Sequence, residues 1–186
     1  MNNYKYLLSG ITMLSLISLN ALADDNSIYP LVSIGLIKPA SFNSSDDKAI
    51  DLSYTPTFSL GLGFDSHLST DWMLTNELTL NYMDADFSVQ SHSGEVTNGN
   101  TQQTGLWAST RLKRLNLIES VSPFIEVAVG VVDADYRYNN TKAHQWQKGY
   151  KAMTGLEFST GTDATISIGI GYSNMNEDVN FSKMGR

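Results

Sequence analysis

The feature that most constrains the fold is a two-residue alternation that recurs along most of the chain. Between residues 54 and 64 the even positions are Tyr, Pro, Phe, Leu, Leu and Phe, and the odd positions are Thr, Ser or Gly. The same alternation covers residues 72–82, 106–112, 150–158 and 166–172. Side chains alternate between the two faces of a strand, so each stretch predicts a β-strand with one apolar face. A strand of about ten residues exceeds the usual globular length and suits a tilted crossing of a bilayer.

Two further regularities favour a membrane barrel over a soluble sandwich. The polar segments alternate between long (39–53, 84–102, 139–147) and short (65–71, 115–121, 159–163). Aromatic residues bracket the apolar faces, as in the pairs Tyr54 and Phe64, Trp72 and Tyr82, and Tyr150 and Phe158. Long loops on one rim, tight turns on the other and two aromatic girdles are typical of outer-membrane barrels. A sandwich would bury the same alternation against a second sheet, but it requires neither regularity.

The N-terminal residues 1–23 are predicted to be a secretory signal peptide. Lys5 precedes an apolar run from Leu7 to Leu19, and Ala21-Leu22-Ala23 supplies a small-x-small cleavage site. We therefore expect residues 24–186 to form one exported domain. The chain has 19 acidic and 12 basic residues, a balance that argues against nucleic acid as a partner. It has no cysteine, so a disulfide cannot stabilise the domain.

Together, the signal peptide, strand spacing, loop alternation and girdles resemble the small outer-membrane β-barrels of the OmpA, OmpX, Ail and opacity-protein type, including accessory-colonisation-factor proteins. The resemblance implies an all-β fold, an antiparallel up-and-down transmembrane β-barrel of about eight strands in the Gram-negative outer membrane. It also implies a non-enzymatic surface role in adhesion, colonisation, virulence or envelope integrity, without a cofactor. The partners it implies are outer-membrane lipid and lipopolysaccharide, with a host-surface or extracellular ligand. The alternatives are a narrow, porin-like pore and a secreted soluble sandwich that binds a ligand.

Two segments depart from this pattern. In the strand beginning near Ile125, the outward positions carry Asp133 and Asp135, so the strand either leaves the membrane there or contains a bulge. Seven strands are complete by Tyr172, counting residues 28–38 as the first. An eighth would come from residues 178–186, where Val179 and Phe181 are the apolar anchors. Since barrel closure pairs every edge, that strand is either short and atypical or truncated.

Several charged residues are expected to meet inside the barrel. The alternation points Glu77, Arg111, Glu126, Lys151 and Glu157 inward, which places Arg111 among three carboxylates. The interpretation we favour is a salt-bridge network that fills a lumen too narrow for an open channel. The alternative is a gated polar path.

A mixed cationic and aromatic segment is the candidate binding surface. It contains Tyr136, Arg137, Tyr138, Lys142, His144, Trp146 and Lys148. Such residues could bind an anionic sugar or a lipopolysaccharide phosphate through cation and ring contacts. The alternative, which we favour, is that the aromatics form the outer girdle while the cations contact the anionic lipid surface.

No arrangement in the sequence predicts catalysis or metal binding. The end of the chain resembles the C-terminal region of the lipid A deacylase barrels, in which a histidine stands two residues before a serine. Here Gly171 occupies that position before Ser173, so the serine has no base to activate it. The paired aspartates at 84 and 86 and at 133 and 135 lack the dense ligand spacing of a calcium loop.

Overall fold

The computed structural model describes residues 10–11, 28–37, 42–43, 49–52, 54–90, 96–115, 117–118, 120–138, 141–160 and 165–175. These residues form the strands β1 (Gly10–Ile11), β2 (Ile28–Ile37), β3 (Phe42–Asn43), β4 (Ala49–Leu52), β5 (Thr55–His67), β6 (Trp72–Gln90), β7 (Val96–Arg114), β8 (Val121–Tyr138), β9 (Thr141–Ser159) and β10 (Thr165–Met175). A search of the described residues finds no helix that is long and apolar enough to span a membrane.

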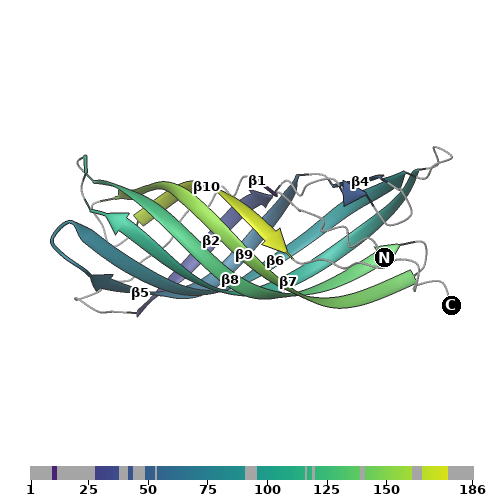
Figure 1. Ribbon diagram of the computed structural model, residues 1–186, viewed down its shortest axis with the longest axis horizontal. Coiled ribbons are helices and arrows are strands. Elements are labelled where there is room, and N and C mark those ends of the chain that lie inside the picture. Colours follow the sequence, from purple (N-terminus) through teal and green to yellow (C-terminus); the bar gives the residue numbers. More distant parts are fainter. Residues whose placement is uncertain are drawn as a thin grey trace, which may run out of the picture.

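Seven long strands form an antiparallel meander in the described part of the chain. The order is β2-β5-β6-β7-β8-β9-β10, and each strand pairs with the next. Figure 1 shows these tilted strands curling into a half-barrel. The predicted all-β, antiparallel, up-and-down barrel fold is therefore confirmed. The expected eighth strand, 178–186, lies outside the described residues.

Two strands of the meander, β10 and β6, each pair with a further short strand. The outer edge of β10 pairs with β1, where Gly10 lies opposite Ser173 and Ile11 opposite Tyr172. β1 lies inside the segment predicted to be a signal peptide, and the cleavage of that segment stays a prediction. β6 continues past the end of its ladder with β5, and there its residues Phe87 to Gln90 pair with Leu52 to Ala49 of β4.

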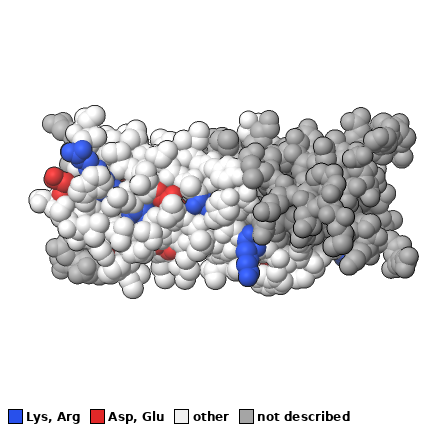
Figure 2. All heavy atoms as spheres, in the orientation of Figure 1, with Lys and Arg blue, Asp and Glu red and all other residues white. Residues whose placement is uncertain are grey.

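The alternation in the sequence separates the two faces of the curved sheet. Leu60, Leu78 and Ile170 on the outer face each keep about half of their surface exposed. The inner face buries a mixture of polar and aromatic side chains, among them Arg111 and Trp107. Figure 2 shows that most of the described surface on this side is uncharged. An apolar exterior around a polar interior is the arrangement of a membrane barrel and the reverse of a soluble one.

Strands β6, β7 and β9 are nearly twice as long as the sequence predicted. The segments 84–102 and 139–147, expected to be long loops, are mostly paired strand. The β6–β7 ladder continues to the pair Gln90 and Val96, and the β8–β9 ladder to Tyr138 and Thr141. Polar composition therefore marks where these strands leave the membrane, and not where the backbone pairing ends, because ladder hydrogen bonds do not require apolar side chains.

The register of β8 decides between the two interpretations of its aspartates. Asp133 lies opposite Trp146 and Asp135 opposite His144, and the pairing continues without an extra residue on either side. A bulge would place two residues of one strand against one of the other. The strand therefore leaves the apolar band at Asp133 without a bulge.

Glycines on the inner face provide the space for two buried aromatic rings. A Cβ atom on Gly130 would lie 2.5 Å from Trp107 Cδ2, and one on Gly149 would lie 2.8 Å from Trp107 Cη2. On Gly155, a Cβ would lie 2.7 Å from Phe124 Cζ and closer still to the backbone oxygen of Ile168. No side chain fits at such distances, so each ring lies directly against the bare backbone of a neighbouring strand.

Candidate functional site

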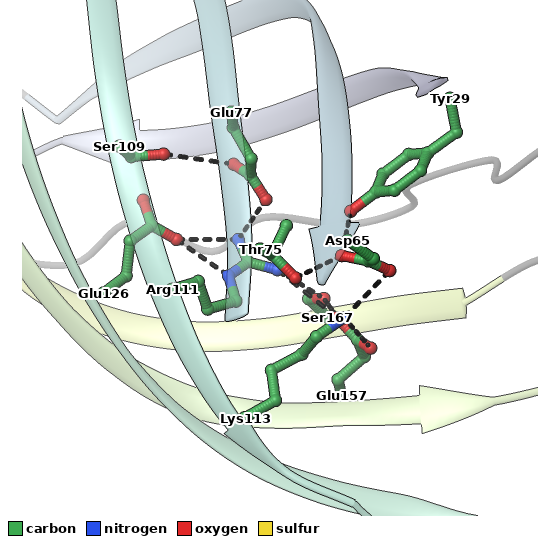
Figure 3. A network of polar contacts seen from close by, with 10 residues as sticks. All are labelled: Tyr29, Asp65, Thr75, Glu77, Ser109, Arg111, Lys113, Glu126, Glu157 and Ser167. Carbon is green, nitrogen blue, oxygen red and sulfur yellow. Dashed lines mark hydrogen bonds and ion pairs between the residues drawn. The ribbon is translucent and has the colours of Figure 1, made fainter. Parts of the chain in front are cut away.

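Arg111 on β7 is the centre of a buried ion-pair network inside the barrel (Figure 3). Its Nε and Nη2 donate to Glu126 Oε2 over 2.9 Å and 2.7 Å. Nη2 also lies 3.3 Å from Glu77 Oε1, and Nη1 donates to Glu157 Oε2 over 3.4 Å. One guanidinium thus ties strands β6, β8 and β9 to β7, a geometry that its planar fork of donors permits and a lysine does not.

A second cation extends the network toward the rim with the short turns. Lys113 Nζ donates to Glu157 Oε1 over 3.0 Å and lies 3.7 Å from Asp65 Oδ2. Asp65 in turn accepts hydrogen bonds from the hydroxyls of Tyr29, over 2.9 Å, and Thr75. Figure 3 shows the two halves of the network meeting at Glu157. Ser167 on β10 donates to Glu157 Oε2 over 3.2 Å, so the connected side chains run from β2 across the inner face to β10.

The network is deeply buried. Arg111 keeps 7% of its surface exposed, Lys113 3%, Glu77 9% and Glu157 8%. Phe124 covers the guanidinium, whose Cζ lies 4.4 Å from the ring centroid. Charges removed from water to this extent are tolerated only when they are paired and hydrogen-bonded, so each member depends on the others.

Lys151 lies apart from this network. Its Nζ is 3.7 Å from the centroid of the Trp107 ring, a cation–π contact. A cavity of about 70 Å³ is lined both by this pair and by Glu77, Arg111 and Glu126 of the network. Space of this size holds a few water molecules, since about 10–15 Å³ accommodates one.

The sequence pointed to five of these charged residues and missed others. The structure places Glu77, Arg111, Glu126 and Glu157 in one network and Lys151 against Trp107. Sequence reasoning missed Lys113 and Asp65. Both have the inward parity of their strands, so the alternation alone contained the signal, but Asp65 had been assigned to a turn.

The candidate surface segment forms the outer parts of β8 and β9. Arg137, Lys142, His144, Trp146 and Lys148 are exposed. Tyr136, predicted to belong to this surface, keeps only 6% exposure and accepts a hydrogen bond from Gln147 Nε2 over 2.8 Å. That assignment was wrong, because the alternation continues past the membrane band and turns Tyr136 inward. Tyr138 is the last residue of β8.

Acidic and amide side chains accompany the cations on this outer part. His144 Nδ1 lies 3.2 Å from Asp133 Oδ1 and 3.1 Å from Asp135 Oδ1. On the neighbouring pair of strands, Asn100 and Gln102 donate to Asp84 over 2.6 Å and 3.1 Å. These hydrogen bonds, chiefly that of Asn100, hold the pKa of Asp84 below its usual value.

Neither acidic group is arranged as a metal site. Within the described residues, no group of three or more acidic, histidine or cysteine side chains is placed to hold a metal ion.

Comparison with known proteins agrees with this architecture. The family model for the outer membrane protein beta-barrel domain matches residues 9–185, nearly the whole chain. No curated protein and no solved structure gives a significant match.

Proposed function

The chain belongs to the family of outer membrane protein beta-barrel domains, and we propose that within it the protein is a small, non-enzymatic barrel of the OmpA, OmpX, Ail or opacity-protein type, which acts through its exposed outer strands. Membership makes it an outer-membrane surface protein. The finer role we propose is adhesion or colonisation, through contact with an anionic sugar on a host surface or with lipopolysaccharide.

The observation that carries this proposal is the length of the two central hairpins. Apolar outward residues end at Tyr82 on β6 and Val131 on β8, yet the strands continue to Gln90 and Tyr138. Paired strands hold their side chains in a fixed register, which loops do not. Arg137 and Lys142 therefore lie directly opposite each other, and Lys148 lies six residues further along β9. These cations are held at fixed positions that suit a sulfated or phosphorylated ligand.

We expect the triple variant Arg137→Ala, Lys142→Ala, Lys148→Ala to bind a sulfated polysaccharide about tenfold more weakly than the parent, since each exposed ion pair contributes up to about 1 kcal/mol. Binding of the refolded protein to immobilised heparin, titrated with salt, measures the effect. Arg114→Ala, which removes a cation at the opposite rim, is the control and should bind as the parent does. Equal binding by the triple variant would refute this role for the hairpins.

We further propose that the lumen is closed to ions. Trp107 and the Arg111 network occupy the inner face at successive levels, and an eight-stranded barrel leaves room for side chains only. We expect no stepwise conductance when the protein is inserted into planar bilayers. Reproducible single-channel steps from the parent protein would instead favour the narrow pore.

A further inference from the structure

A side-chain amide lies on the lipid-facing surface between the two girdles. On β6 the outward residues from Trp72 to Tyr82 are Leu74, Asn76, Leu78 and Leu80. Asn76 is exposed, and among the described outward positions between the girdles it carries the one side-chain amide. It lies four residues from Trp72 on its own strand and directly opposite Phe64 on β5, which places it just on the hydrocarbon side of that girdle.

The structure satisfies only one side of this amide. Thr110, directly opposite on β7, donates its hydroxyl to Asn76 Oδ1 over 2.9 Å. The described residues supply no acceptor for Asn76 Nδ2, whose two hydrogens remain on the lipid-facing side. In hydrocarbon no water can accept them, and an amide without a partner there costs a few kcal/mol. By contrast, Thr154 on the same outer face donates to the backbone oxygen of Phe124.

The surroundings of Asn76 allow a close approach by another membrane protein. In the next row of the sheet, Ala108 lies between Leu78 and Val129. Both neighbours are more than half exposed and project beyond the short side chain of Ala108, so the surface is recessed at Ala108 and apolar around it. Small residues beside a polar side chain are the features that favour association inside a bilayer, where burial of apolar surface gives no driving force.

We propose that the lipid-facing surface of β6 and β7 around Asn76 and Thr110 is a docking surface for a second copy of this chain. A two-fold axis near Asn76 brings the same patch of each copy together. Each Asn76 Nδ2 then donates to the Asn76 or Thr110 oxygen of the other copy, so the pairing satisfies both amides at once. A lipid tail has no acceptor to offer, and a lipid headgroup lies beyond the girdle. This inference does not depend on the proposed adhesive role.

The test uses the absence of cysteine from the chain. Ala108→Cys places a thiol inside the proposed interface, and Ile168→Cys places one on the outward face of β10. Each protein is reconstituted into phosphatidylcholine vesicles at low protein-to-lipid ratio and oxidised with copper phenanthroline, and the dimer is quantified on gels. We expect Ala108→Cys to form the disulfide-linked dimer and Ile168→Cys to stay monomeric.

The amide is then tested in the Ala108→Cys background. Asn76→Leu should reduce the cross-linked fraction on the order of tenfold. The variant should still fold, which is seen when the unheated barrel resists SDS and migrates differently from the heated protein on a gel. Equal cross-linking at both cysteine positions would mean random collision and would overturn the proposal. So would an absence of cross-linking at Ala108→Cys, or full cross-linking after Asn76→Leu. The comparison between the two cysteine positions holds even if Asn76→Leu does not fold.

Discussion

Arg111→Ala is expected to lower the free energy of unfolding by about 3–5 kcal/mol, the usual cost of removing one partner from a buried ionic network. The variant leaves Glu77, Glu126 and Glu157 facing one another, and of these three Lys113 pairs with Glu157 only. Urea-induced unfolding in micelles, followed by tryptophan fluorescence, measures the change. Arg111→Lys should recover only part of the loss, because a single ammonium cannot bridge three carboxylates on three strands.

The matched control for this prediction is Arg114→Ala on the same strand. Arg114 is exposed and its Cζ lies 5.9 Å from the centroid of the Trp72 ring, so its removal should cost less than about 1 kcal/mol. If Arg111→Ala and Arg114→Ala unfold at the same urea concentration, the ionic network does not hold the strands together, and the buried charges need another explanation.

Gly155→Val should destabilise the barrel by about 3 kcal/mol or prevent it from folding, at the upper end of overpacking costs. The new side chain would displace the Phe124 ring and press on the backbone of β10 at Ile168. Phe124 in turn lies against the Arg111 guanidinium, so the displacement reaches the ionic network. Urea-induced unfolding again provides the measurement, with the fraction that shows a heat-dependent gel shift reporting correct folding.

Ala152→Val is the control for the glycine variant. Ala152 lies on the same strand, faces outward and is exposed, so the added methyl groups enter lipid and should be tolerated. The combination of Gly155→Val with Phe124→Ala tests the mechanism, because removing the ring should relieve part of the strain. A double variant whose destabilisation equals the sum of the two single effects would show that Phe124 and Gly155 do not compete for the same space.

The sequence allowed the fold to be predicted because the strands obey one simple rule. A period of two fixes which side chains face inward, and a single slip in register would reverse every one of them. That rule alone places Arg111 and Glu126 on one inner face. It does not give the distances between neighbouring strands, which depend on register, so the contact of Lys151 with the Trp107 ring could not be foreseen.

The extent of the strands was harder to predict, for a physical reason. Residues 84–90 and 96–102 contain many polar side chains, and polarity is the usual sign of a loop. In this structure their backbone groups still pair, from Asp84 opposite Gln102 to Gln90 opposite Val96. Hydropathy reports the boundary with lipid, whereas strand length depends on whether the facing strand also continues. A single sequence does not reveal that second condition directly.

The projecting β8–β9 hairpin would make this barrel a scaffold for presenting foreign peptides. Its ladder is unbroken up to Tyr138 and Thr141, and it rises about 20 Å beyond Val131, the last apolar residue on the outer face of β8. A peptide grafted between those two residues would be carried on paired strands, well above the lipid surface. An antibody could then reach it on whole cells without competing with the membrane for access.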